Sequence, residues 1–191
     1  MIKAIIFDCF GVLTEDSWHV FRTGLPDGPK QTCQDLMQQY SSGFLNRDEF
    51  LKGVSLQTGK SLEEISTILS SKHHKNTQLL DYISSLKKQY KISILSNIAN
   101  NWIRDELLSS NDQSLFDDML FSFEVGITKP DKRIFELACQ RLGVRPDEAV
   151  LVDDIESYCL AAKEFGMKAI VYKGFEDMKD QLVGALADSN S

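Results

Sequence analysis

The fold of this chain is decided by residues 5–14, which read Ile5-Ile6-Phe7-Asp8-Cys9-Phe10-Gly11-Val12-Leu13-Thr14. An apolar, partly β-branched run ends at Asp8, and a glycine follows at Gly11. This pattern predicts a strand that carries one carboxylate at its carboxyl end, followed by a turn. A single Asp often does no more than end a strand. Because open α/β sheets bind ligands at the carboxyl ends of their strands, Asp8 is also a candidate nucleophile.

Three later segments place further reactive groups directly after apolar runs, namely Ser96, Lys129 and the pair Asp153-Asp154. Each group has an ordinary structural explanation by itself, as a turn, a helix start or a helix cap. Their joint occurrence at successive predicted strand ends instead predicts one shared site at one edge of a sheet.

The second half of the chain alternates short apolar runs with amphipathic segments. Apolar runs at 92–95, 119–123, 149–152 and 169–172 are typical of strands, and the segments 102–108, 131–142, 155–166 and 176–187 are typical of helices. Asp131 is the expected cap of one helix, and Gly143 its expected stop. This alternation predicts an α/β fold with a parallel sheet.

Residues 15–73 contain no convincing strand and several helix starts. Ser61 to Glu64 matches a capping box, Asn46 precedes a helical run, and Pro26 to Pro29 indicate a loop. Asn76 then opens a helix that leads back to the sheet. We therefore expect a core of residues 1–14 and 75–191, with residues 15–74 inserted as a helical unit.

Composition narrows the class of protein. A chain of 191 residues with 42% hydrophobic content can bury one substantial core beside a modest insert. The formal net charge of −7 argues against nucleic acid and anionic membranes as partners, because both require clustered Lys and Arg. No segment has the apolar length that crosses a bilayer. A small-molecule partner is expected, whereas no sustained heptad indicates an oligomeric state.

The cysteines are scattered along the sequence, at Cys9, Cys33, Cys139 and Cys159. Without close paired spacing they indicate neither a zinc site nor a redox dithiol. We expect buried, reduced thiols and, since no signal peptide is evident, a cytoplasmic location. Cys9 follows the candidate nucleophile, but strand alternation points it away from Asp8, so we interpret it as a packing residue.

Together the candidate residues suit phosphoryl transfer. The Asp8 carboxylate can attack phosphorus to give an aspartyl-phosphate that water later cleaves. The Lys129 ammonium can hold the transferring oxygens, while Ser96 and the amide of Asn97 can donate hydrogen bonds. Asp8, Asp153 and Asp154 would concentrate negative charge that a hard cation relieves, which predicts Mg²⁺ as the cofactor.

With these residues in order, the sequence resembles the haloacid dehalogenase-like hydrolase superfamily. Its first motif resembles the segment from Asp8 to Leu13, its second Ser96, its third Lys129-Pro130-Asp131 and its fourth Asp153-Asp154. The resemblance implies a Rossmann-like core with helices on both faces and a helical cap after the first motif. It also implies Mg²⁺ held by Asp8, the backbone carbonyl of Phe10 and the last acidic pair.

The sequence departs from this family at Phe10. Most phosphatases of the family carry there a second aspartate, which protonates the leaving oxygen. Loss of a general acid typically costs about a hundredfold to ten-thousandfold in rate, which leaves activated esters such as anomeric or acyl phosphates within reach. Water, Glu15 or His19 could supply the proton instead. Tyr158 is a second departure, since many relatives carry an asparagine there.

Three functions remain open after this comparison of motifs. A phosphatase fits the acidic pair and Lys129. A 2-haloacid dehalogenase also lacks the second aspartate, but its reaction needs no metal, and Asp153-Asp154 would repel an anionic haloacid. A non-catalytic binding or regulatory module fits Phe10, but it has no need for mutually repelling carboxylates. We therefore predict a Mg²⁺-dependent phosphatase of a small phosphorylated metabolite such as a sugar or acyl phosphate.

The helical cap is expected to select the substrate. Trp18, His19, Arg22 and Lys30 are plausible members of its pocket, although each residue type is more often found in packing or on the surface. The sequence assigns no role to them.

Overall fold

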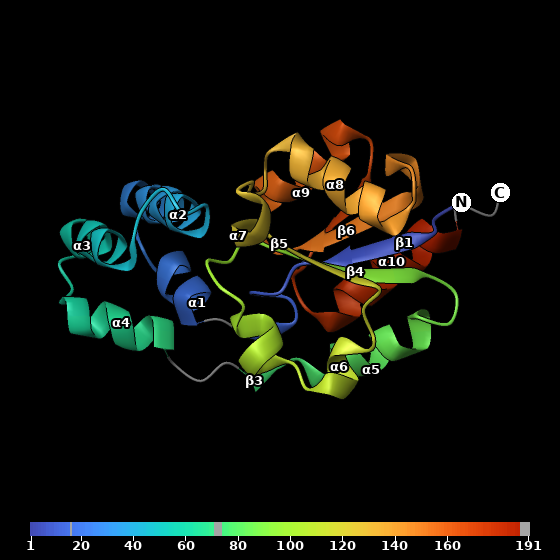
Figure 1. Cartoon of the computed structure of the whole chain (residues 1–191), viewed down its shortest axis with the longest axis horizontal. Coiled ribbons are helices and arrows are strands. Elements are labelled where there is room, and N and C mark those ends of the chain that lie inside the picture. Colours follow the sequence, from blue (N-terminus) through green and yellow to red (C-terminus); the bar gives the residue numbers. More distant parts are fainter. Residues whose placement is uncertain (16, 71–73, 188–191) are drawn as a thin grey trace.

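Strand β1 (Ala4–Phe7) lies at the centre of a five-stranded parallel sheet. The computed structural model describes residues 1–15, 17–70 and 74–187. The strand order is β5-β4-β1-β6-β7, where β4 spans Lys91–Ser96, β5 Asp118–Phe121, β6 Ala149–Asp153 and β7 Lys168–Val171. All four pairings are parallel, so the carboxyl ends of the strands meet at one edge (Figure 1).

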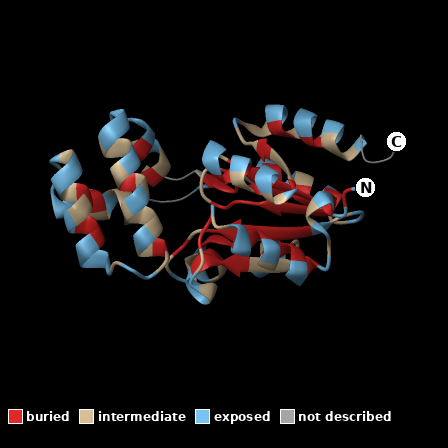
Figure 2. Ribbon diagram, turned by 90° about the horizontal axis from the view of Figure 1, so that it is seen from above, coloured by how far each residue is buried: buried red, intermediate tan, exposed pale blue. Residues whose placement is uncertain are grey.

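Alternation along β1 divides the core into two apolar layers, one on each face of the sheet. Ile5 and Phe7 pack with α5 (Thr77–Leu86) and α10 (Phe175–Ala187), whereas Ala4 and Ile6 pack with α8 (Lys132–Leu142) and α9 (Glu156–Phe165). Figure 2 shows the strands buried between these helices. The predicted α/β class with a parallel sheet is confirmed, and its helices cover both faces.

Local signals in the sequence explain where several core helices begin and end. The Asp131 side chain accepts a hydrogen bond from the backbone N–H of Arg133 at the start of α8, and Gly143 closes this helix with φ at 63°. Asn76 caps α5 by accepting from the N–H of Leu79. Both predictions from capping residues are confirmed, because each cap satisfies a backbone group that the helix leaves unpaired.

Shorter elements complete the core, and some differ from the prediction. They are a π-helical turn at Ile103–Leu107, α6 (Ser110–Gln113), α7 (Ser122–Val125) and a 3-10 turn at Pro146–Glu148. The strand expected over 119–123 ends at Phe121, because the chain turns into α7 at Ser122, whose hydroxyl accepts a hydrogen bond from the N–H of Ile98 at 2.9 Å.

A separate helical unit lies beside the carboxyl edge of the sheet (Figure 1). It comprises α1 (Ser17–Thr23), α2 (Asp27–Ser41), α3 (Arg47–Thr58) and α4 (Leu62–Ser70). Its own apolar cluster is built around Trp18, Phe50 and Ile65. The capping box of Ser61 with Glu64 forms as expected, and Asn46, which was expected to precede a helix, forms a second capping box with Glu49. The loop expected at Pro26 to Pro29 is instead the beginning of α2.

A short antiparallel pair of strands connects this unit to the core. Strand β2 (Thr14–Glu15) pairs with β3 (His74–Lys75), and Thr14 lies opposite Lys75. The pair straddles the boundaries that we expected at 14/15 and 74/75. The sequence did not indicate it, since two-residue strands carry no readable alternation.

Candidate active site

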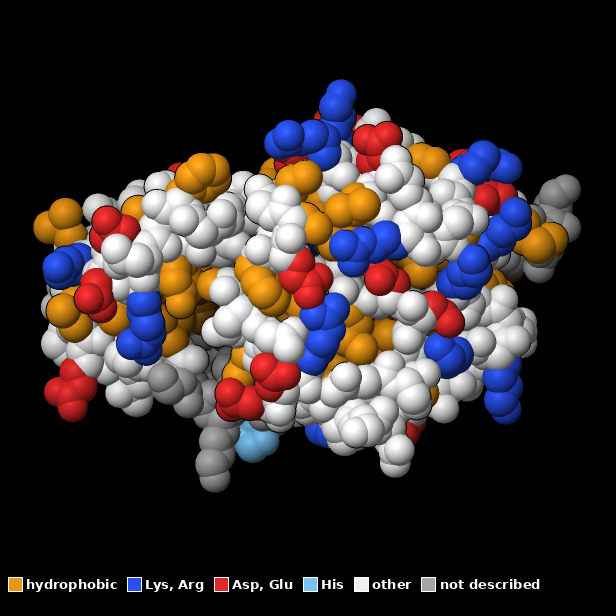
Figure 3. Space-filling model, viewed as in Figure 1, with side chains coloured by type: hydrophobic (Ala, Val, Ile, Leu, Met, Phe, Trp, Pro, Cys, Tyr) orange, Lys and Arg blue, Asp and Glu red, His pale blue; other side chains and the backbone are white. Residues whose placement is uncertain are grey.

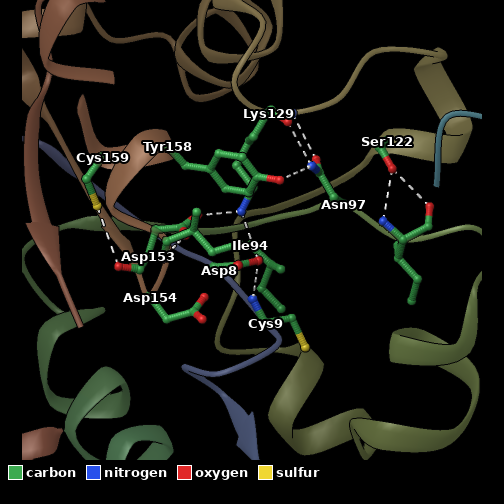
Figure 4. A network of polar contacts seen from close by, with 12 residues as sticks. Asp8, Cys9, Ile94, Asn97, Ser122, Lys129, Asp153, Asp154, Tyr158 and Cys159 are labelled. Atoms are coloured by element: carbon green, nitrogen blue, oxygen red, sulfur yellow. Dashed lines mark hydrogen bonds and ion pairs between the residues drawn. The ribbon is translucent and has the colours of Figure 1, made fainter. Parts of the chain in front are cut away.

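Asp8 directly follows β1 and is only 5% exposed. Its backbone N–H continues the sheet by donating to the carbonyl of Val152 at 2.9 Å. One oxygen of its carboxylate, Oδ1, accepts a hydrogen bond from the backbone N–H of Cys9 at 2.7 Å. The sheet and the turn after it therefore hold this carboxylate at the carboxyl edge (Figure 4).

Lys129 crosses to Asp8 from the segment between α7 and α8, and its side chain is fully buried. Its Nζ lies 3.0 Å from Asp8 Oδ1 and 2.6 Å from Asp153 Oδ2. It also lies 5.3 Å from the centre of the Tyr158 ring. The geometry is that of an ammonium shared by two carboxylates, with an aromatic face beside it.

Asn97 holds the backbone of Lys129 in place. The Asn97 amide accepts from the N–H of Lys129 at 2.9 Å and donates to its carbonyl, also at 2.9 Å. The hydroxyl of Tyr158 accepts a further contact from Asn97 at 3.4 Å. Tyr158 therefore occupies, with Asn97, the position from which the lysine is oriented (Figure 4).

Burial and the attraction between Lys129 and the carboxylates shift the pKa values of this cluster in opposite directions. Burial raises the pKa of Asp8 to about 8; the Lys129 ammonium opposes this, and the carboxylates of Asp153 and Asp154 add to it. Burial also raises the pKa of Asp153, again against the effect of Lys129. Burial would lower the pKa of Lys129, but Asp153 and Asp8 outweigh burial and raise it. The single ammonium of Lys129 thus faces several carboxylates, and a bound cation would reduce the repulsion among them.

The residues fit a divalent cation. Asp8, Asp153 and Asp154 each offer a carboxylate oxygen, and these oxygens lie within 4.8 Å of one another. Oxygen ligands of this kind suit Mg²⁺. Gly11, with φ at 81°, leaves room for Asp154, because a Cβ at this position would lie 2.7 Å from Asp154 Cγ.

The acidic pair divides into two environments. Both oxygens of Asp153 are engaged, Oδ2 by Lys129 and Oδ1 by the backbone N–H of Ile155 at 2.9 Å. Asp154 Oδ2 lies 2.7 Å from His19 Nδ1, yet within the described residues it accepts no hydrogen bond of suitable geometry. Asp154 is therefore the member of the pair with coordination capacity to spare.

Ser96 and Phe10 complete the immediate surroundings of Asp8. Ser96 ends β4 and is fully buried, and its hydroxyl has no hydrogen-bond partner among the residues that the structure describes. Phe10 stacks on Trp102, with the ring centres 6.0 Å apart. An aromatic contact thus occupies the position where the family places a second carboxylate.

A cavity of about 570 Å³ opens onto Asp8 and Asp154 between the sheet edge and the helical unit. Its aromatic wall is formed by Phe10, Trp18, Tyr40, Trp102 and Tyr158. Its polar groups include Arg22, Gln34, Gln38, Asn97 and Asn100. The volume suits a small metabolite, and the mixed lining suits a ligand with both polar groups and a carbon skeleton.

The structure brings the expected residues together to different degrees. Asp8, Lys129, Asp153 and Asp154 form one cluster, as the strand ends predict. The Asn97 side chain binds Lys129 rather than pointing freely into the cavity. Trp18, His19 and Arg22 line the cavity, whereas Lys30 is not among its lining residues. The side chain of Glu15 lies outside the described part.

A carboxylate at the end of β1, a buried lysine and an acidic cluster on a parallel sheet form the arrangement expected of a hydrolase that uses a carboxylate as its nucleophile. The model of the haloacid dehalogenase-like hydrolase family matches residues 2–166. The chain belongs to this family.

Similar proteins include a phosphatase and a dehalogenase. D-ribitol-5-phosphate phosphatase of Bacteroides thetaiotaomicron is 30% identical over 95% of this chain and 97% of its own length. (S)-2-haloacid dehalogenase 4A of Burkholderia cepacia is 26% identical over 88% of this chain and 82% of its own. A HAD family enzyme from B. thetaiotaomicron, solved with magnesium and inorganic phosphate, is 25% identical with a TM-score of 0.65, covering 95% of this chain and 99% of that one.

Proposed function

We propose that this chain is a Mg²⁺-dependent phosphatase of a small phosphorylated metabolite that works through an aspartyl-phosphate on Asp8. The observation that carries the proposal is the buried ammonium of Lys129, which lies 3.0 Å from Asp8 within an excess of carboxylates, of which Asp8 and Asp154 line the cavity. A cluster of this charge has no packing function, but it suits a site where a cation and an anionic substrate meet.

The chain's own residues divide the reaction into two displacements. First, Asp8 attacks phosphorus; the bond from phosphorus to the ester oxygen breaks, and that oxygen leaves with a proton from water. Water then attacks the aspartyl-phosphate, which releases inorganic phosphate and regenerates the Asp8 carboxylate. Lys129 and the unpartnered Ser96 hydroxyl stabilise the phosphoryl oxygens during both displacements.

Asp8, Asp154 and the backbone carbonyl of Phe10 would hold Mg²⁺, while Asp153 keeps Lys129 in place. When bound, Mg²⁺ neutralises the charge of the phosphoryl group and lowers the pKa of Asp8 from its raised value. This division of roles follows from the engaged oxygens of Asp153 and the spare coordination capacity of Asp154.

The cavity favours a sugar or polyol phosphate over a short haloacid. A volume of about 570 Å³ would leave a haloacid surrounded mostly by water. A relative that covers nearly the same length acts on D-ribitol 5-phosphate, a polyol phosphate. Residues 15–74 would serve as the cap over this cavity, because α2 reaches the core where the Ser122 hydroxyl contacts the carbonyl of Ser41 at 3.0 Å.

Partners and location follow from the surface and the cysteines. Figure 3 shows acidic and basic side chains interspersed on one face, without a continuous basic stripe. Within the described residues, no helix combines the length and apolar character needed to cross a membrane. All four cysteines are buried thiols, which supports a reducing compartment such as the cytoplasm.

The function is tested by phosphate release from a panel of sugar, polyol and acyl phosphates, with Mg²⁺ or with a chelator. We expect release that requires the metal, disappears in Asp8→Asn and persists in Asp177→Asn, an exposed control on α10. The phosphoenzyme is sought by mass spectrometry after rapid acid quenching. Metal-independent halide release from short haloacids, with no phosphate release from any ester, would establish a dehalogenase instead. Absence of both activities would favour a binding module.

A further inference from the structure

Arg22 on α1 is a buried cation without an anionic partner among the described residues, and it lines the cavity. We propose that it binds a second anionic group of the substrate, a carboxylate or a further phosphate, on the half of the molecule that leaves. This inference rests on the proposed phosphatase function and names the class of its substrates.

Arg22 contacts no anionic group among the described residues. The residue is 7% exposed. Its NH1 donates to Gln34 Oε1 at 2.9 Å, and its NH2 lies 3.4 Å from His19 Nδ1. The first contact is to an amide and the second to an imidazole, so neither supplies a negative charge. No carboxylate of the described residues lies within ion-pair distance of Arg22. A buried guanidinium usually has an anionic partner, because its desolvation is costly.

The other arginines of the chain make the pattern clear. Those outside the cavity all pair with carboxylates: Arg104 with Glu124, Arg133 with Asp131, Arg141 with Asp118, and Arg145 with Asp147 and Glu148. The two without a carboxylate partner among the described residues, Arg22 and Arg47, both line the cavity. Arg47 is exposed and donates to Ser66 Oγ at 2.9 Å, so solvent compensates its charge. Arg22 lacks this compensation.

The position of Arg22 sets the shape of the ligand. His19 and Arg22 lie three positions apart on α1, hence on one face of the helix. His19 Nδ1 lies 2.7 Å from Asp154 Oδ2 and 3.4 Å from Arg22 NH2, so the guanidinium lies no more than about 6 Å from the Asp154 carboxylate. Gln34 on α2 fixes the guanidinium from the other side. An anionic group at Arg22 would thus lie a short carbon chain away from a phosphoryl group at Asp8.

The charges along the cavity wall would orient such a ligand. Asp8 and Asp154 repel an anion unless a cation is bound to them, whereas Arg22, which neighbours them across His19, attracts one. A neutral polyol phosphate would leave the guanidinium uncompensated in the complex. The arrangement therefore favours phosphorylated sugar acids and bisphosphates over neutral sugar phosphates.

The test compares substrates that differ only at the far end, namely phosphogluconate and glucitol phosphate, each esterified on the terminal carbon remote from the variable group. Glucitol bisphosphate is the third substrate. We expect kcat/KM of the wild-type enzyme to be about tenfold to a hundredfold higher for one of the doubly anionic substrates than for glucitol phosphate, the range that a charge-assisted hydrogen bond supplies. Which of the two is preferred tells a carboxylate from a second phosphate.

Variants test whether Arg22 causes the preference for a doubly anionic substrate. Arg22→Gln should remove it while changing kcat/KM for glucitol phosphate less than about threefold, and Arg22→Lys should restore part of it. Arg47→Gln, which removes the exposed arginine of the same cavity, should leave it intact. The inference is overturned by a wild-type enzyme without the preference, by equal losses on all substrates in Arg22→Gln, or by loss of the preference in Arg47→Gln.

A binding measurement separates this inference from the proposed function. Calorimetric titration of the wild-type protein with gluconate and with glucitol needs neither phosphate release nor a variant that folds. Tighter binding of gluconate, lost in Arg22→Gln where that variant folds, supports the anion site even if no ester is hydrolysed. Equal binding of the two compounds by an active phosphatase rejects the anion site and leaves the phosphatase function standing.

Discussion

Lys129 and Asp153 form a fully buried ion pair, with Nζ 2.6 Å from Oδ2. The pair places the ammonium against Asp8 and occupies the carboxylate that would otherwise compete with Asp154 for a cation. One side chain therefore both activates the candidate nucleophile and divides the roles of the acidic pair.

Removal of this ammonium should destabilise the protein strongly. Lys129→Met leaves buried carboxylates without a counter-charge, and we expect a loss of about 3–5 kcal/mol in the free energy of unfolding, measured by urea denaturation without metal. Lys129→Met combined with Asp153→Leu should recover much of this loss but no activity. Arg145→Gln, which breaks an exposed pair with Asp147, should cost less than about 1 kcal/mol. A single Lys129→Met variant as stable as wild type would contradict the account.

Asp8→Asn should stabilise the metal-free protein, and the more so as pH rises. The pKa of Asp8 is about 8 in the folded protein against an ordinary 3.8, so the folded state retains a proton that the unfolded chain releases. The stability contributed by protonated Asp8 is complete below the unfolded pKa and is lost as pH rises through the folded one. Asparagine does not titrate.

We therefore expect the stability advantage of Asp8→Asn to grow between about pH 4 and pH 8, by about 3–5 kcal/mol. Thermal or urea unfolding of both proteins across this range, with a chelator present, measures it. Saturating Mg²⁺ should reduce or reverse the difference, because the cation stabilises the carboxylate. An advantage that shrinks with pH would show that Asp8 is ionised in the metal-free fold.

Phe10 makes the rate sensitive to the leaving group. Without a carboxylic acid at this position, cleavage should slow steeply as the pKa of the leaving alcohol rises. A plot of log kcat/KM against that pKa, for aryl and alkyl phosphates, measures the slope. Phe10→Asp should flatten it by favouring alkyl esters, at some cost in stability from the lost Trp102 contact. A shallow slope in the wild-type enzyme would mean that another group already supplies the proton.

Gly11 should matter for metal binding, and Gly59 offers a matched control. Both glycines have positive φ, at 81° and 69°, so alanine at either position should cost about 1 kcal/mol or more in stability. Only at Gly11 would the new Cβ meet Asp154, whereas nothing lies within 4 Å at Gly59. Titration calorimetry with Mg²⁺ should show weaker binding for Gly11→Ala alone. Equal affinities in both variants would remove Asp154 from the metal site.

Much of the core followed from local pattern. Apolar runs that end in Asp8, Ser96 and Asp153 predict strands, and the parallel arrangement brings their carboxyl ends to one edge. The caps Asp131 and Asn76 predicted helix starts for the same reason, since capping depends on residues only a few positions apart. Strand ends and helix caps could therefore be predicted, because they depend on residues that are close together in the sequence.

The remaining features depend on long-range packing. Asp153 and Asp154 are identical in type and adjacent, so only the position of Lys129 distinguishes them. His19 meets Asp154 where α1 approaches the sheet edge, and Arg22 meets Gln34 where α1 approaches α2. The seven residues of α1 do not show by their periodicity which groups will face the helix. The β2–β3 pair joins residues 60 positions apart, which leaves no trace in either short segment.

The pairing of Thr14 with Lys75 brings the chain back to the place where it left the core. The intervening helices therefore leave the core and rejoin it at one place, the β2–β3 pair. We expect that another segment whose ends meet at strand-pairing distance can take their place without a change in the register of β1, provided that it does not clash with the core at Asp154 and Ser122. Exchange of these helices between relatives should accordingly transfer substrate preference, while the residues of the candidate active site stay in place.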